Sequence, residues 1–337
     1  MKKLDELMRG AGGTGKILTV AVAAYNVEKY IRSAMDSFLQ VKNAEKLEVL
    51  VFDDGGTDDT FKICEEYAGK LPDSIRLIHT ENGGHGNVIN SGIREATGLY
   101  YKVVDGDDRL DPAGLDHLIE ILEETDADIV FNSFDTFDDE TGETTSVIGQ
   151  KAEIHRNRKI GLSDHWKDLT FRMHAMTFKS KLLLENDVKV ALHRFYVDKE
   201  YVLKGLLGAD TVYVDDTVIY HYRLGRDGQS VSMSGTKKHY RDHEDLVMNM
   251  LKAADGIEDL SYKSELCKEF IRPYVYKQYM IFAHFGKKKE FRDYDKTLYN
   301  DYREYYDSVT RKKLTLLRKC GSLLIPIWDL IDHEAFL

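Results

Sequence analysis

The sequence predicts an α/β protein in which a mostly parallel sheet is flanked by helices and followed by a helical extension. Two observations lead to this fold class. Between residues 17 and 134, short apolar runs alternate with amphipathic segments of helical period, and from about residue 237 onward the period is helical and rich in Lys, Glu and Tyr. Alternation of this kind indicates βαβ crossovers, which join parallel strands. In such sheets ligands bind beyond the carboxyl ends of the strands.

The elements are expected in a regular order along the chain. The expected strands are residues 17–23, 47–52, 75–80, 100–104 and 129–134. The expected helices are residues 28–39, 57–71, 87–96 and 112–125. Further on, we expect an exposed acidic loop at 138–143, a helix near 198–207 and a strand at 211–222. We expect a flexible leader at 1–16, an α/β domain at 17–234 that divides after residue 112, and a helical extension at 235–337.

Composition narrows the class of protein. The 47 basic and 58 acidic residues give a formal charge of −11, so nucleic acid is not an expected partner. The three cysteines are odd in number and far apart, which argues against a disulfide framework or a zinc cluster and fits a reducing cytoplasm. Residues 1–16 lack the apolar core of a signal peptide, and the longest apolar stretch, 314–331, is interrupted by charges and a proline. We therefore expect neither secretion nor a membrane span.

Each of four expected strands ends in distinctive polar residues. The four groups are Ala24-Tyr25-Asn26, Asp53-Asp54-Gly55, Glu81-Asn82-Gly83-Gly84 and Asp105-Gly106-Asp107. Carboxylates at the edge of a sheet can hold a divalent cation against a diphosphate, although Asp and Gly are also common in ordinary turns. The aspartates after residue 52 can accept hydrogen bonds from a nucleobase or simply cap the next helix. The glycines permit close backbone approach before a helix N-terminus, which favours anions.

In combination these segments resemble the inverting glycosyltransferases of family 2, which have the GT-A fold and use nucleotide sugars. Six matches occur in the family's order over about residues 17–112. They begin at Tyr25-Asn26-Val27-Glu28, Phe52-Asp53-Asp54-Gly55 and Glu81-Asn82-Gly83-Gly84, and continue at Asn90-Ser91-Gly92, Ala96-Thr97-Gly98 and Asp105-Gly106-Asp107-Asp108. The resemblance implies a nucleotide-binding half at 17–112 and an acceptor half at 113–234.

The resemblance also implies roles for individual residues. Ala23, Tyr25 and Glu28 would line the nucleotide, and Asp54 would read the base. Asp105 and Asp107 would serve a Mg²⁺ or Mn²⁺ ion that neutralises the departing diphosphate, with Asp107 as the direct ligand. The remaining residues expected to bind the nucleotide sugar are Asn82, Gly83, Asn90 and Gly106.

Inversion requires a base on the side opposite the leaving group. In the family this base is an acidic residue at the start of a helix, commonly in an acidic pair that is followed by two residues and then an aromatic residue. Segment 195–201 is similar to that motif and places Asp198 as the base and Tyr201 as the aromatic residue. Because the usual acidic neighbour is Val197 here, Glu200 remains a second candidate. The alternative for Asp198 is a plain helix cap.

Two histidines and two arginines are further candidates. His174 would touch the acceptor, or else it is a structural histidine of the core. His221 would add a metal or phosphate contact at the end of its strand. Arg223 and Arg226 would belong to a loop that closes over the diphosphate, or else they are solvated surface residues.

The expected activity is transfer of a single hexose from a UDP-sugar to a saccharide or lipid-linked acceptor in bacterial surface polysaccharide or glycoconjugate synthesis. The Gln-x-x-Arg-Trp signature and membrane helices of processive relatives are missing from the sequence. Segment 311–337 joins basic residues to an apolar run, so it would dock on the inner face of the membrane, pack on its own domain or contact a second subunit. The alternative functions are a nucleotidyltransferase and a catalytically silent nucleotide-sugar-binding protein.

Overall fold

The computed structural model describes residues 15–151, 156–226, 233–257, 261–319 and 325 of the 337-residue chain. The chain divides into two compact units, residues 1–226 and 227–337, whereas the sequence placed this boundary after residue 234. The expected leader, 1–16, falls almost entirely outside the described residues.

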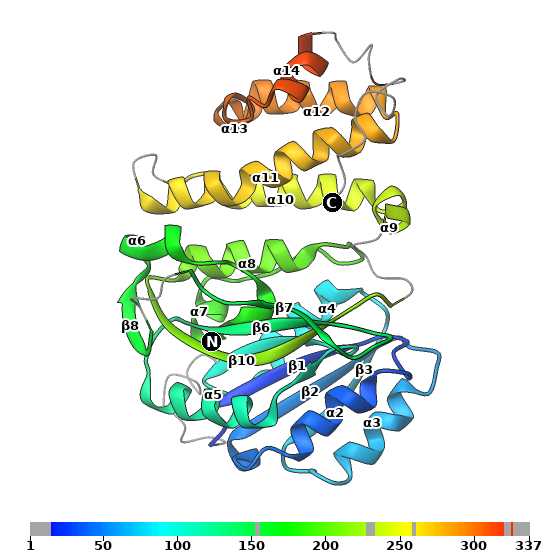
Figure 1. Ribbon diagram of the computed structural model, residues 1–337, viewed down its shortest axis with the longest axis vertical. Helices are drawn as coiled ribbons and strands as arrows, with labels where there is room; N and C mark the ends of the chain where they lie inside the picture. The colour runs from blue at the N-terminus through cyan, green and yellow to red at the C-terminus, as the bar shows by residue number, and fades with distance from the viewer. Residues whose placement is uncertain (1–14, 152–155, 227–232, 258–260, 320–324, 326–337) are drawn as a thin grey trace. The chain divides into compact units, whose positions relative to one another are not determined.

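The first unit contains one mixed, mostly parallel sheet (Figure 1). Its main path has the order β3-β2-β1-β4-β9-β6-β10-β5, with β7 paired to β6 and β8 paired to β10. The strands are β1 (Leu18–Ala24), β2 (Leu47–Asp54), β3 (Ile75–Thr80), β4 (Tyr100–Asp105), β5 (Arg109–Leu110), β6 (Ile129–Asp138), β7 (Thr144–Ile148), β8 (Arg158–Gly161), β9 (Met176–Lys179) and β10 (Thr211–Leu224). The predicted fold class is confirmed.

The register of β1 explains where the polar strand ends meet. β1 runs parallel to both β2 and β4, and Ala23 is the Cα partner of Phe52 on one side and of Asp105 on the other. Asp54 is in turn the partner of Thr80 on β3. The carboxyl ends of these four strands therefore share one edge of the sheet, as the βαβ pattern predicts.

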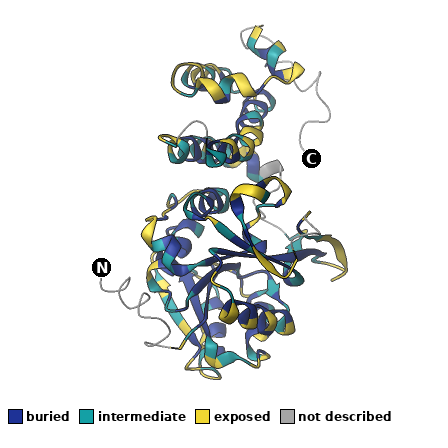
Figure 2. Ribbon diagram, turned by 90° about the vertical axis from the view of Figure 1, so that its left-hand side faces the viewer, coloured by how far each residue is buried: buried dark blue, intermediate teal, exposed yellow. Residues whose placement is uncertain are grey.

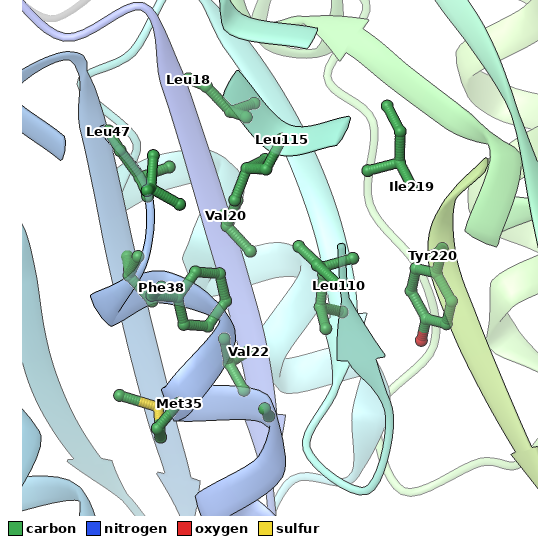
Figure 3. Close-up of a cluster of buried hydrophobic side chains, with 14 of the residues drawn as sticks. Leu18, Val20, Val22, Met35, Phe38, Leu47, Leu110, Leu115, Ile219 and Tyr220 are labelled. Atoms are coloured by element: carbon green, nitrogen blue, oxygen red, sulfur yellow. The ribbon is translucent and has the colours of Figure 1, made fainter. Parts of the chain in front are cut away.

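Helices cover both faces of this sheet. The α-helices of the first unit are α2 (Ile31–Leu39), α3 (Thr60–Ala68), α4 (His85–Glu95), α5 (Pro112–Glu124), α6 (Leu162–His165), α7 (Ser180–Glu185) and α8 (Val197–Gly208), with short 3₁₀ helices η1 (Ala44–Lys46), η3 (Trp166–Asp168) and η4 (Met173–Ala175). Helix α2 buries Ile31, Met35 and Phe38, which are spaced to share one face. This face packs against Val20 and Val22 of β1 in the core cluster of Figure 3. The central strands are almost wholly buried (Figure 2).

Beyond residue 134 the fold departs from the expectation. Strand β6 continues to Asp138, and much of the expected acidic loop forms the turn between β6 and the antiparallel β7. Strand β9 lies antiparallel between β4 and β6 and was not expected. It has only four residues, and its place in the sheet depends on partners far away in sequence, which local periodicity does not reveal.

The second unit is helical in its described residues, as the period predicted. Its helices are α9 (Met233–Lys238), α10 (Tyr240–Ala254), α11 (Tyr262–His284), α12 (Lys288–Asp301), α13 (Arg303–Ser308) and α14 (Lys312–Lys319). Within this unit Arg318 of α14 contacts Asp295 at 2.9 Å and stacks over the Tyr306 ring, 3.6 Å from its centroid. Among the described residues, no helix combines the length and apolar character needed to cross a membrane.

Candidate active site

The turn after β4 is in close backbone contact with the end of β1. The Gly106 amide donates to the Ala23 carbonyl at 2.9 Å, and a Cβ atom at Gly106 would lie 2.7 Å from that oxygen. Only glycine permits this approach, which no real side chain tolerates. Gly106 therefore sets the position of the aspartates on either side of it, next to the end of β1.

Asp105 ends β4 and faces the first residue of helix α4. Its Oδ1 atom lies 3.2 Å from Nε2 of His85. Burial alone would raise the pKa of Asp105, but the charge and hydrogen bond of His85 hold that pKa at about 2. Burial conversely lowers the pKa of His85, yet the charge of Asp105, followed by those of Asp198 and Asp107, raises it above the ordinary value. His85 thus lies within electrostatic reach of both the Asp105 turn and Asp198.

The next two aspartates of the turn contact the end of β10. The Asp107 carboxylate forms an ion pair with Arg226, while burial and the charge of Asp105 raise the pKa of Asp107. Asp108 is fully buried and accepts hydrogen bonds from the Tyr220 hydroxyl at 2.5 Å and the Arg223 amide at 2.7 Å. Burial, then the charges of Asp107 and Asp105, raises the pKa of Asp108 well above its usual range.

His174 joins this group from η4. Its ring packs against Phe134, Tyr220 and Tyr222 at centroid distances of 5.2, 4.8 and 4.6 Å. Burial lowers the pKa of His174 to about 4, so the imidazole is neutral at physiological pH. Its Nδ1 atom is buried without a hydrogen-bond partner, which is costly unless a ligand or ion completes the site.

The position of His174 corrects the expectation for His221. Consecutive side chains of a strand point to opposite faces, and Tyr220 and Tyr222 both contact His174. His221, between them, points away and contacts Asp135 at 2.8 Å instead. His221 therefore does not belong to the carboxylate cluster, and His174, which the sequence suggested for the acceptor, does.

The donor set fits a divalent cation. Asp105, Asp108 and His174 each offer a ligand atom, and these atoms lie within 4.8 Å of one another. Two carboxylates and a neutral imidazole with an orphaned nitrogen suit Mn²⁺ or Mg²⁺, and the carboxylates of the turn need positive charge to offset their repulsion. Asp107, the predicted direct ligand, is adjacent but contacts Arg226 instead.

Asp54, at the end of β2, has a different environment. It is 2% exposed and accepts hydrogen bonds from the Gly83 and Gly84 amides, the shortest at 2.7 Å, and from the Asn87 amide group at 2.8 Å. The Thr80 hydroxyl adds another at 3.2 Å. These hydrogen bonds stabilise the turn that precedes α4. Recognition of a nucleobase by Asp54 stays a prediction.

Helix α4, which follows the glycine turn, contacts the segment before α8. Asn90 both donates to the Val190 carbonyl and accepts from the Val190 amide, each at 2.9 Å, so its side chain clamps a backbone. A Cβ atom at Gly86 would lie 2.0 Å from the Ala191 carbonyl oxygen. The Asn90 amide thus holds the two halves of the sheet domain together, whereas Asn82 is exposed on the turn.

The end of β1 provides an open aromatic surface. Tyr25 is 50% exposed, directly after the strand. Glu28 accepts a hydrogen bond from the Asp59 amide at 3.0 Å, and its own amide donates to Asp58. Tyr25 is thus accessible to a ligand, and Glu28 is tied to the loop after β2.

Helix α8 contains both candidate bases, but their surroundings differ. Tyr196, in the left-handed region at φ 67°, precedes the helix, and Asp198 lies in its first turn with Lys199 against its Oδ2 atom. Glu200 is 2% exposed and pairs with Lys204 at 2.7 Å. The charge of Asp198 acts on both His85 and His174. The role of Asp198 as the base, with Glu200 as the alternative, stays a prediction.

Sequence reasoning missed two members of the site, His85 and Asp108. Both stood in segments that it singled out, the glycine turn and the acidic turn. A histidine as the first residue of a helix that starts at this edge of the sheet was the available signal for His85. Nothing local predicted that Asp108 rather than Asp107 would turn toward His174, because β10 sets that orientation through Tyr220.

Comparisons with known proteins give the family to which the chain is similar. A model of "Glycosyl transferase family 2" matches residues 19–185. Glycosyltransferase GlyG of Streptococcus pneumoniae is 28% identical over 62% of this chain and 71% of its own length. The uncharacterized glycosyltransferase EpsJ of Bacillus subtilis is 29% identical over 61% of each chain, so this chain matches less than two thirds of that relative.

A solved structure shares the fold. It is that of residues 1–349 of Staphylococcus aureus TarS in complex with UDP-GlcNAc, with a TM-score of 0.69 and 19% identity, covering 92% of this chain and 89% of that one. With the family match over β1 to α7, this identifies the chain as a glycosyltransferase of family 2, with the GT-A fold.

Proposed function

We propose that this protein is an inverting glycosyltransferase that moves a sugar from a UDP-sugar to a hydroxyl acceptor. The observation that carries the proposal is the gathering of Asp105, Asp108 and His174 at the strand edge, within electrostatic reach of Asp198. The UDP-GlcNAc in the TarS complex supports a UDP-sugar donor. TarS is named as a poly(ribitol-phosphate) β-N-acetylglucosaminyltransferase, which supports a bacterial surface polymer or its lipid-linked precursor as acceptor.

The donor would lie along the ends of β1 and β4. Tyr25 would flank the nucleoside, and Asp105, with Asp108 and His174 or with Asp107, would hold the cation. A bound Mg²⁺ or Mn²⁺ would supply positive charge to the departing diphosphate. His85 and Arg226, which contact Asp105 and Asp107 in this structure, are side chains that can redirect to phosphate oxygens.

Asp198 would act on the acceptor. It accepts the proton of the acceptor hydroxyl as the oxygen attacks the anomeric carbon, and the bond from that carbon to the diphosphate oxygen breaks on the opposite side. The nucleoside diphosphate leaves with the bonding electron pair. Because Lys199 contacts Oδ2, the acceptor approaches Oδ1 of Asp198.

The test is Asp198→Asn, with Glu200→Gln as the matched control. We expect the first change to lower kcat about 10³-fold, because the amide cannot take the proton, and the second to leave kcat within about tenfold. UDP release is measured with a panel of UDP-sugars and Mn²⁺, and NMR of the product gives its anomeric configuration. Full activity of Asp198→Asn would remove it as the base, and retained configuration would contradict inversion.

The remaining partners are also proposals. Membrane contact of segment 311–337 stays a prediction, and nearly all of residues 320–337 lie outside the described residues. In the described part of the tail, Arg311 stacks over Tyr276 at 4.3 Å and Leu314 and Leu317 are buried, so this part packs within the helical unit. Dimer formation and the reducing cytoplasm likewise remain predictions.

A further inference from the structure

A lysine is buried in the middle of the sheet, close to the candidate cation site. Lys102 of β4 is 0% exposed. An ammonium group is costly to bury unless hydrogen bonds compensate it. Its Nζ atom donates to the His174 carbonyl at 2.8 Å and to the Met176 carbonyl at 3.3 Å, and it lies 5.8 Å from the centroid of the Tyr220 ring.

Lys102 occupies the point where two strands separate. The β4–β9 pairing comprises Tyr100 with Lys179 and Tyr101 with Phe178, and it ends there, although Met176 still pairs with Phe131 on β6. The amine of Lys102 bonds to backbone carbonyls just beyond the last paired residues. An apolar residue at this position would leave those carbonyls without this donor.

The backbone that Lys102 holds is that of His174 itself. The imidazole is packed by aromatic rings, two of them from β10, and β10 also supplies the Tyr220 hydroxyl and the Arg223 amide to Asp108. The aromatic rings restrict the orientation of the imidazole. The hydrogen bond from Lys102 connects the backbone of η4 to β4. Asp105 lies three residues further along the same strand, so Lys102 links the histidine rigidly to the carboxylates.

We propose that Lys102 is a positioning residue that fixes the main chain at His174, so that the imidazole faces Asp105 and Asp108 as a cation ligand. The inference rests on the proposed cation site. Residues that orient metal ligands through hydrogen bonds typically change metal affinity 10–100-fold when removed. Burial lowers the pKa of Lys102 to about 7, but the role does not depend on its charge, because the neutral amine retains two N–H donors.

The experiment measures Mn²⁺ affinity of the full-length protein in the presence of UDP, by calorimetry and by the electron paramagnetic resonance of free Mn²⁺. Lys102→Met removes the donors at similar length, and Lys102→Arg retains them. We expect Lys102→Met to weaken Mn²⁺ binding about 10–100-fold and Lys102→Arg to recover part of the loss. In the double variant with His174→Ala, Lys102→Met should add less than twofold, since its effect passes through that histidine.

Three outcomes would overturn the inference. A folded Lys102→Met variant with wild-type Mn²⁺ affinity would overturn the role of Lys102 but not the cation site. The same conclusion would follow if the losses of Mn²⁺ affinity from Lys102→Met and His174→Ala multiplied fully in the double variant. Wild-type protein that binds no Mn²⁺ with UDP present would overturn the cation site as well. Should Lys102→Met fail to fold, Lys102→Gln replaces it, with folding checked by circular dichroism. Its amide group lies one bond short of the position of the lysine Nζ atom, so we expect it to lose the hydrogen bond to the His174 carbonyl and to weaken Mn²⁺ binding, and wild-type affinity would overturn the inference.

Discussion

Two parallel strands of one sheet, β2 and β4, end in neighbouring aspartates, and the structure uses the two pairs differently. Asp53 and Asp54 are satisfied by their surroundings: Asp53 bonds the Gly56 amide and His79, and Asp54 bonds the turn before α4. The turn after Asp105 packs three carboxylates together and adds a histidine nitrogen with no partner. An acidic strand end thus becomes a candidate cation site where its carboxylates crowd one another, because a bound cation would offset their mutual repulsion.

The largest effect is expected from Asp105→Asn. The change removes a cation ligand and the partner of His85, so we expect kcat/KM for the donor to fall about 10³-fold. Steady-state kinetics measure this loss. Near-normal turnover would break the distinction between the strand ends.

Asp54→Asn should show the opposite profile. An amide cannot accept all the hydrogen bonds that Gly83, Gly84 and Asn87 donate, so we expect the free energy of unfolding to fall by about 3 kcal/mol. Mn²⁺ affinity of the folded variant should stay within about threefold of wild type. Denaturant titration measures the first quantity, and Asp126→Asn, at an exposed carboxylate, is the control expected to lose much less stability. Unchanged stability with a raised donor KM would instead indicate that Asp54 binds the nucleobase of the donor.

Lowering the pH should reduce the stability of the folded protein through protonation of His174. In the unfolded chain a histidine takes up its proton near pH 6.5, but His174 does so only near pH 4 in the folded protein. The unfolded state binds more protons in between, so stability should fall by about 3 kcal/mol as pH drops from about 6.5 to 4. His174→Gln should abolish that share. His243, buried in the second unit with a pKa of about 4, contributes separately, and His243→Gln measures its share.

Urea unfolding at pH 7 and pH 4.5 makes this comparison. The prediction fails for His174 if His174→Gln loses as much stability between the two pH values as the wild-type protein does.

The smallest effect is expected at the end of β1. Tyr25→Ala removes an exposed ring that would stack on the nucleoside, and base–aromatic stacking of about 1–3 kcal/mol predicts a donor KM about tenfold higher with kcat unchanged. Tyr25→Phe is the matched control and should keep the wild-type KM. An equal rise in both variants would point to the hydroxyl, and no rise in either would place the nucleoside elsewhere.

The sequence predicted the parts of this site that depend on local pattern. The apolar run before Asp105, the turn at Gly106 and the start of α8 before Asp198 all follow from periodicity and turn residues. The choice of His174 over His221 could not be predicted, because it depends on which face of β10 packs over η4. Asp108 and Lys102 depend likewise on β9 and β10, whose pairing partners are distant in sequence.

We expect the cation to bind at the Asp105 end of the sheet edge and not at the Asp54 end. A crystal structure with UDP and Mn²⁺, with data collected at the manganese absorption edge, tests it most directly. We predict one anomalous peak within coordination distance of both Asp105 and His174. A peak at Asp53 and Asp54, or bound UDP with no peak beside Asp105, would contradict the account.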